Sequence, residues 1–215
     1  MQSSGPYWTL RTSYQDPKQT QRRTCISTEM VAASSTDADT VFLQKYKFKG
    51  CTWSTYTHDA YYNVTFQDTS SSTNDLRMKW VPIPKPHATQ PGKTNGEVYG
   101  TERDYSFKYW NETEGCFVLT FNNAEDQKEC ELLVWNPEGT AKAEKQLRTE
   151  ERSEDNTETI VEGRFKECKK NYKIECPKAS EEILFDKYCK ITNEQFLSII
   201  SNSPGDIDTS QCTEQ

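Results

Sequence analysis

The chain has 215 residues and a formal net charge of −7, with 33% apolar and 27% charged residues. This length and composition predict one large domain in which the core is thin or much of the chain lies outside it. The negative charge, with basic residues interleaved among acidic ones, argues against nucleic acid as a partner, and no apolar run is long enough to predict a membrane span.

Alternating apolar and polar residues from Tyr7 to about Trp135 predict antiparallel β-strands. The stretches "TSSSTND" and "VPIPKPHATQPGK" are predicted loops, because proline lacks a backbone donor and fixes its own φ. About eight strands favour a closed barrel or a sandwich. The predicted strands are Tyr7 to Tyr14, Thr24 to Ser34, Thr40 to Lys49, Ala60 to Gln67, Glu97 to Gly100, Tyr105 to Trp110, Cys116 to Asn122 and Cys130 to Trp135.

The composition changes after Trp135. Residues 136–156 form a charged insertion with almost no aromatic residues, which predicts a solvated helix or a loop. A helix is predicted over residues 157–172, where Ile160, Val161, Phe165 and Cys168 recur at helical spacing. The extension 178–215 contains a short strand candidate, "EILFDKYC", then the apolar "QFLSII" and a polar tail with Cys212.

Eight cysteines without a CxxC pair predict disulfides rather than a zinc site, and therefore a secreted protein. The sequons at Asn63 and Asn111 are predicted glycosylation sites and point the same way. The polar residues after Met1 lack the apolar core of a signal peptide, so we expect a mature secreted chain. A glycan on Asn63 would place that side chain in water and its neighbours Tyr62, Val64 and Phe66 inside.

The order of strands, helix and cysteines resembles that of the tick salivary lipocalins, the family of histamine-binding and complement-binding proteins of tick saliva. The resemblance runs from "YWTLRTSYQDPKQTQRRTC" to "EILFDKYC". Its anchors are "RRTC" ending at Cys25, "CFVL" at Cys116, "CELLVW" at Cys130, and "ECKKNYKIEC". The resemblance implies an eight-stranded up-and-down barrel, a C-terminal helix packed on its outside, a central cavity and no catalysis.

The resemblance also implies two disulfides, Cys25 with Cys189 and Cys116 with Cys168. Exclusion then favours Cys130 with Cys176 and Cys51 with Cys212, although eight cysteines allow 105 pairings in general. A hairpin disulfide from Cys116 to Cys130 stays open as an alternative. The chain departs from the family in beginning almost directly at its first strand, and in its long charged insertion and tail.

The amine-binding members of the family carry a Cys-Asp pair on one strand and Glu-Leu followed by Trp or Tyr on the next. Here Phe117 replaces the aspartate and Leu133 replaces the aromatic residue, while Glu131 matches the ligand-binding glutamate. A protonated amine requires both carboxylates and aromatic walls, so this degraded pattern weakens an amine-binding role.

Hairpin geometry predicts that Glu131 points into the barrel. If Cys116 lies opposite Cys130, the odd-numbered residues of both strands share the more apolar face. A desolvated Glu131 there needs a partner, such as Arg11, a tyrosine hydroxyl or a bound cation. Three interpretations stay open: a structural pair, a ligand contact, or simple exposure. The cavity candidates are Tyr62, Phe66, Phe117, Leu119, Glu131, Leu133 and Trp135, with Phe121 on the same face.

An enzyme is not predicted. His58 and His87 fall in loop-like stretches, Asp59 beside His58 is interpreted as a chance pair, and no nucleophile motif, metal spacing or cofactor motif occurs. Two binding hypotheses remain. One is a scavenger that takes a small amine such as histamine or serotonin, or an eicosanoid or other lipid, into the barrel.

The other hypothesis is an inhibitor that holds a host defence protein with its loops and extensions. The enlarged polar surface favours this one, because recognition often resides in loops on a rigid scaffold. The stretch "YWTLRTSYQDPK" also looks like the first strand and Asp-Pro-Lys turn of complement-binding members. We therefore predict a monomeric, secreted immune-evasion lipocalin whose main partner is a vertebrate complement protein.

Overall fold

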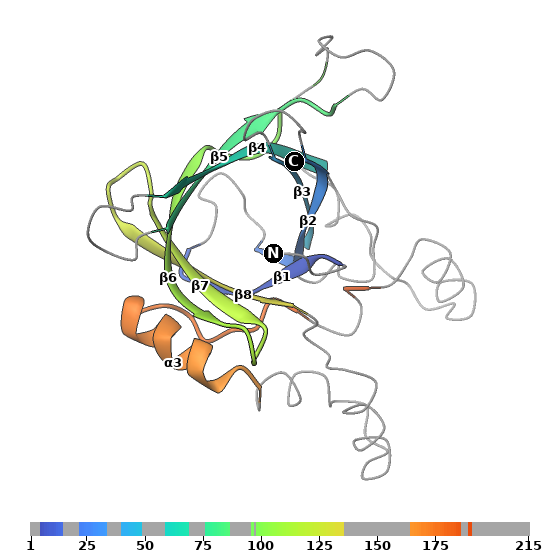
Figure 1. Cartoon of the computed structure of the whole chain (residues 1–215). Coiled ribbons are helices and arrows are strands. Elements are labelled where there is room, and N and C mark those ends of the chain that lie inside the picture. The colour runs from blue at the N-terminus through green and yellow to red at the C-terminus, as the bar shows by residue number, and fades with distance from the viewer. Residues whose placement is uncertain are drawn as a thin grey trace, which may run out of the picture.

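The computed structural model describes residues 5–14, 22–33, 40–48, 59–68, 76–86, 96, 98–135, 164–185 and 189–190. Eight antiparallel strands follow one another around a closed barrel, and β8 pairs with β1 to complete it (Figure 1). This is an up-and-down barrel of the lipocalin fold, as predicted. The strands are β1 (Tyr7–Thr12), β2 (Arg23–Ala33), β3 (Thr40–Phe48), β4 (Asp59–Asp68), β5 (Leu76–Ile83), β6 (Arg103–Asn111), β7 (Cys116–Asn122) and β8 (Lys128–Trp135).

Seven of the predicted strands match observed ones, and one is wrong. Within the described residues 98–100 there is no strand, whereas β5, which was assigned partly to a loop, includes Val81, Pro82 and Ile83. The pairing of β5 with β6 runs only from Arg77 to Trp80, while Pro82 faces Tyr62 of β4. Pro82 thus pairs with β4 but has no partner in β6, and at such a position its missing N–H is tolerated.

The strands β7 and β8 present two different faces. Phe117 lies opposite Leu133 and Leu119 opposite Glu131, so odd-numbered residues of both strands face the barrel interior. The predicted parity is confirmed, but Cys116 lies opposite Val134 and not opposite Cys130. Even-numbered residues in the middle of the two strands, such as Val118 and Leu132, are buried outside the barrel in one cluster with residues of the C-terminal helix.

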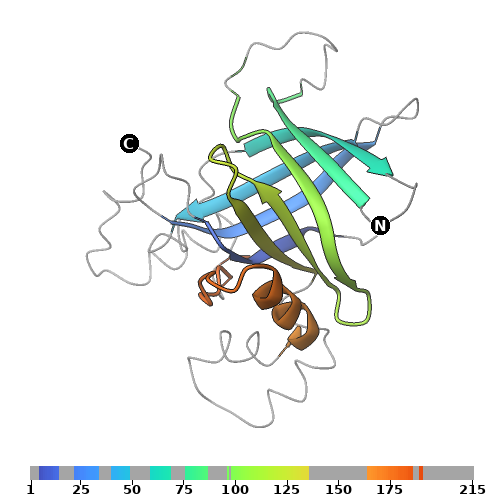
Figure 2. The ribbon, with the colours of Figure 1, turned by 90° about the vertical axis from the view of Figure 1, so that its left-hand side faces the viewer.

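The helix α3 (Lys166–Glu175) packs on the outside of β6, β7 and β8 (Figures 1 and 2). The disulfides Cys116–Cys168 and Cys130–Cys176 tie it to β7 and β8, and Cys25–Cys189 ties the C-terminal segment to β2. The alternative Cys116–Cys130 hairpin disulfide is therefore wrong. The helix begins later than predicted: Arg164 and Phe165 precede it, and residues 157–163 lie outside the described residues.

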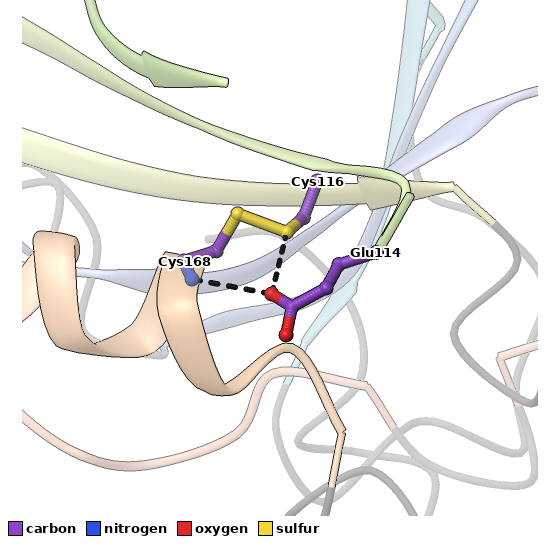
Figure 3. Close-up of side chains that lie close together, drawn as sticks. All are labelled: Glu114, Cys116 and Cys168. Carbon is purple, nitrogen blue, oxygen red and sulfur yellow. Dashed lines mark hydrogen bonds between the residues drawn. A yellow bond between two sulfur atoms is a disulfide. The ribbon is translucent and has the colours of Figure 1, made fainter. Parts of the chain in front are cut away.

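A carboxylate caps the start of α3. Glu114, in the turn between β6 and β7, accepts a hydrogen bond from the backbone N–H of Glu167 at 3.4 Å. It accepts another from the backbone N–H of Cys168 at 3.3 Å (Figure 3). These N–H groups have no partner inside the helix, and a negative charge there also favours the helix dipole. Glu114 and the sulfurs of Cys116 and Cys168 lie within 4.8 Å of one another, but both sulfurs belong to one disulfide and offer no thiolate to a metal.

The C-terminal segment completes the wall between β1 and β2. These strands pair directly only at Tyr7 with Thr28 and Trp8 with Ser27. Farther along, the N–H of Leu184 donates to the carbonyl of Leu10 at 2.9 Å, and the N–H of Cys25 donates to the carbonyl of Leu184 at 2.7 Å. The described part of "EILFDKYC" therefore bridges two strands, although residues 182–185 do not form the predicted strand.

Some predictions concern residues outside the described ranges. These are Cys51 and Cys212 with their pairing, both histidines, the charged insertion 136–156, and "QFLSII".

Candidate functional site

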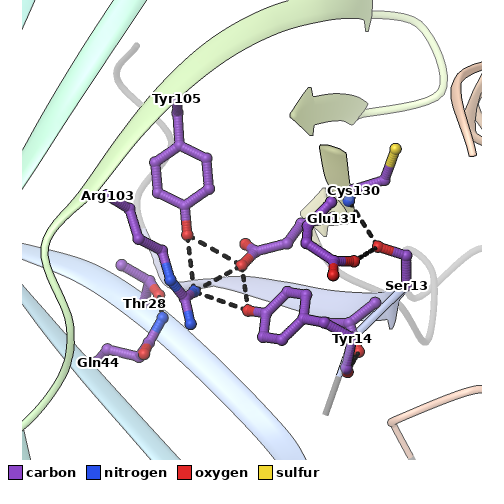
Figure 4. Close-up of polar contacts among 10 residues, drawn as sticks. Ser13, Tyr14, Thr28, Gln44, Arg103, Tyr105, Cys130 and Glu131 are labelled. Carbon is purple, nitrogen blue, oxygen red and sulfur yellow. Dashed lines mark hydrogen bonds and ion pairs between the residues drawn. The ribbon is translucent and has the colours of Figure 1, made fainter. Parts of the chain in front are cut away.

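The site begins with Glu131, which lies inside the barrel and is only 3% exposed. Its Oε1 atom accepts a hydrogen bond from the Tyr105 hydroxyl at 2.9 Å and one from the Arg103 Nη1 at 2.8 Å. The Tyr14 hydroxyl donates to the same oxygen (Figure 4). Glu131 therefore points inward as expected. Of the three partners considered for it, Arg11, a tyrosine hydroxyl or a bound cation, it meets tyrosine hydroxyls, and it also meets Arg103, which was not predicted.

Register and a bulge bring these side chains together. Glu131 pairs with Thr12 of β1, so Tyr14, just beyond the end of β1, lies near it. Arg103 and Tyr105 are two residues apart on β6 and so extend to the same face. Their long side chains reach Glu131 across the intervening strand β7.

Arg11, the predicted arginine partner, is not part of this group. The pairing of β1 with β8 shifts register between Thr9 and Arg11, and Arg11 pairs with Leu132 on the helix-facing side. A β-bulge changes which residues face inward, so simple alternation fails beyond it. Without the bulge, Arg11 would share the inward face of Thr9.

Arg103 holds the group together electrostatically. Its Nη1 also donates to the hydroxyls of Tyr14 at 2.7 Å and Tyr105 at 2.9 Å. Its guanidinium carbon lies 4.8 Å from the ring centroids of both Tyr14 and Phe121. Burial alone lowers the pKa of Arg103, but Tyr105, Tyr14 and Glu131 outweigh this and raise it well above its usual value. Arg103 is therefore charged and balances the charge of Glu131.

The two tyrosines remain neutral hydrogen-bond donors. Burial raises the pKa of Tyr14 and of Tyr105 well above their usual 10.0; Arg103 opposes this shift, and Glu131 adds to it. A neutral hydroxyl is the form that can donate to a carboxylate. Glu131 is thus bound by side chains of this chain. Of the three interpretations, a structural pair, a ligand contact or simple exposure, this arrangement corresponds to the structural pair.

A small cavity adjoins this group. Its volume is about 30 Å³, far below the roughly 300 Å³ at which ordinary ligand sites begin. It lies at the end of the barrel where β1 ends and β2 and β6 begin. We call it the arginine pocket, and it is lined by Thr9, Thr12, Tyr14, Arg22, Arg23, Ile26, Gln44, Arg103 and Glu131.

Aromatic side chains form a buried cluster in the described interior beside this pocket. Trp80 contacts the rings of Phe42, Tyr62 and Tyr105, with ring centroids 4.9 to 5.4 Å apart. Such edge-on and tilted contacts are those that aromatic rings prefer. Of the predicted cavity residues, Tyr62, Phe117, Leu119 and Leu133 are buried and Trp135 is partly buried, so they form a packed core.

Phe66 corrects one prediction. It has the parity of Tyr62 and Val64, which are buried, but its side chain is 42% exposed. It lies near the end of β4, opposite the buried Met78. Asn63 has the opposite parity and is half-buried, and Asn111 ends β6; glycosylation of both stays a prediction.

No protein-family model matches the chain, and no curated protein is significantly similar to it. In the part of the chain that the structure describes, no helix is both long enough and apolar enough to cross a bilayer. The three disulfides among the described residues indicate an oxidising environment of the kind found outside cells.

Proposed function

We propose that this protein is a secreted tick salivary lipocalin that suppresses host defence by binding a host protein, a component of the complement system. In this proposal it acts by binding and not by catalysis. The lipocalin fold and the disulfides support the general class. The resemblance of "YWTLRTSYQDPK" to complement-binding members supports the choice of partner.

One observation carries the choice of a protein partner over an amine: Arg103 already balances the charge of Glu131. The two form an ion pair at 2.8 Å inside the barrel. A protonated amine would have to compete with this arginine, in a pocket that Arg22 and Arg23 also line. Bringing another cation there is unfavourable, because like charges repel strongly in a partly desolvated site.

The packed interior weakens the broader scavenger hypothesis. Many aromatic and aliphatic side chains of the described interior are buried against one another, and the arginine pocket has a volume of about 30 Å³. A lipid mediator or a whole amine needs a much larger enclosed volume. Recognition by loops at the surface needs no such cavity.

Capture from vertebrate serum tests the proposal. The folded chain is immobilised, and the proteins that it captures are identified by mass spectrometry. A complement-dependent haemolysis assay measures whether the folded chain inhibits complement. The matched control is the same chain after reduction and alkylation, which destroys the disulfide-tied fold. We expect a complement component on the folded chain alone and inhibition of haemolysis.

Calorimetry with histamine, serotonin and a leukotriene is run on the same preparation. The proposal fails if no specific serum protein is captured while one of these mediators binds tightly. Capture of a host protein outside complement would retain the binding role and overturn the assignment of partner.

A further inference from the structure

The arginine pocket has an unusual charge balance. Three of its nine lining residues are arginines, and one, Glu131, is acidic. Arg103 is paired with Glu131, and Arg22 is paired at 2.7 Å with Glu182, which is not among the lining residues. Arg23 lies with its guanidinium carbon 4.2 Å from the ring centroid of Tyr46. By residue type, the lining thus has three cationic side chains and one acidic one.

The pocket also offers a donor without an acceptor. Among the described residues, the buried Nε of Arg22 has no hydrogen-bond partner. Arg103, the neighbouring donor of the lining, uses its Nη1 for its contacts with Tyr14, Tyr105 and Glu131 (Figure 4). A buried N–H without an acceptor is costly, and a bound acceptor would remove that cost.

The size of the pocket limits what can enter it. A volume of about 30 Å³ accommodates one or two water-sized groups. A carboxylate has two oxygen atoms, fits this size and carries only acceptors, and a small inorganic oxyanion such as hydrogen phosphate can present two acceptor oxygens in the same way. Guanidinium groups bind such anions well, because their planar N–H donors match two oxygen atoms at once.

We propose that the arginine pocket binds a single carboxylate group or an oxyanion of similar size. Arg22 and Arg103 donate to the anion, and Arg23 contributes charge. The anion is either free in solution or is a carboxylate of a protein partner that reaches into this end of the barrel. The site rests on the pocket itself and not on the identity of the host protein.

Titration of the ¹⁵N-labelled folded chain with acetate and with inorganic phosphate at constant ionic strength tests this proposal. The arginine Nε–H resonances are resolved from the backbone and report the site directly. We expect the Nε–H signal of Arg22 to shift and saturate with either anion. The absence of any saturable shift of the Arg22 and Arg103 signals overturns the proposal.

Two variants separate the pocket from general surface charge. Arg22→Gln removes a donor from the pocket and should weaken anion binding about tenfold or more, as expected for loss of a charge-assisted hydrogen bond. Glu182→Gln removes the negative charge that pairs with Arg22 and that lies outside the pocket lining. The affinity for the anion should then stay equal or become higher. Equal affinity of Arg22→Gln and the unmodified chain contradicts the site. Near-UV circular dichroism verifies that both variants are folded, and Arg22→Lys provides a second variant with intermediate affinity.

Competition by short peptides identifies the source of the anion. A peptide with a free C-terminal carboxylate is compared with the same peptide in amidated form. Displacement of acetate by the free-acid peptide alone indicates a carboxylate of a protein partner. Displacement by neither peptide, with acetate still saturating the Arg22 signal, indicates a free anion. Capture of a host protein by Arg22→Gln at the original level would leave the proposed function intact even if anion binding were lost.

Discussion

Arg103 of β6 and Glu131 of β8 form a buried ion pair at 2.8 Å although the whole of β7 lies between their strands. Their side chains are 15% and 4% exposed, so neither charge is well hydrated. The ion pair itself and the hydroxyls of Tyr14 and Tyr105 replace the lost contacts with water. The glutamate that resembles an amine ligand is therefore part of the barrel's own structure.

Breaking this pair should destabilise the barrel strongly. Glu131→Gln leaves the Arg103 charge buried without its counter-ion, and we expect a loss of about 3–5 kcal/mol in the free energy of unfolding. The double variant Arg103→Met with Glu131→Leu should lose much less than the two single changes added together. Urea denaturation measures Glu131→Gln, the single variants Arg103→Met and Glu131→Leu, and their double variant. The control Lys128→Gln, which breaks the exposed pair with Glu175, should cost under about 1 kcal/mol. Additive losses would show that the pair is not coupled.

The buried tyrosines should make the barrel sensitive to alkali. Burial raises the folded-state pKa of Tyr14 and Tyr105 above the value of 10.0 expected in the unfolded chain. The folded state therefore holds their protons more tightly, so this stabilisation is complete below pH 10 and is lost as pH rises towards the folded-state values. We expect stability to fall above about pH 10, and absorbance at 295 nm to show these two tyrosines ionising only with unfolding. Their ionisation in the folded barrel would contradict this.

The bridge made by Leu184 should depend on the Cys25–Cys189 disulfide. The sequence separation of 164 predicts that this disulfide contributes about 5 kcal/mol in the chain-entropy view, a model-dependent value. We expect the double Cys→Ser variant to lose about 2–5 kcal/mol. Amide exchange should accelerate at Leu184 and at residue 25, whose N–H groups form the bridge. Unchanged exchange at both would show that the backbone bonds alone hold this segment.

The carboxylate of Glu114 should stabilise α3 from outside the helix. Glu114→Ala removes the acceptor for the N–H groups of Glu167 and Cys168, and we expect a loss of about 1 kcal/mol. Glu112→Ala is the matched control, because this exposed glutamate lies in the same turn. Faster amide exchange in the first turn of α3 should appear in the first variant only. Equal effects of the two would indicate a general influence of charge on the turn.

The fold was predictable because most strands alternate cleanly and the cysteines follow a family-like order. The site was only half predictable. The inward direction of Glu131 follows from local alternation in one hairpin, whereas Arg103 meets it through contacts across a third strand, which sequence spacing does not encode. The prediction that Arg11 could pair with Glu131 was wrong because a bulge in β1 reverses the alternation of its side chains. The end of β5 was missed because it contains Pro82, which pairs with β4 but has no partner in β6.

Phe117 and Phe66 give a direct test of whether the barrel interior is packed. Both are phenylalanines with inward parity, but Phe117 is 2% exposed among other aromatic rings and Phe66 is 42% exposed. Phe117→Ala should lower the free energy of unfolding by about 3–5 kcal/mol, because the space it leaves cannot be refilled without moving neighbouring strands. Phe66→Ala should cost much less, since water already reaches its ring. Denaturation measures both, and similar small losses would mean that the interior around Phe117 is loosely filled and has room for a ligand.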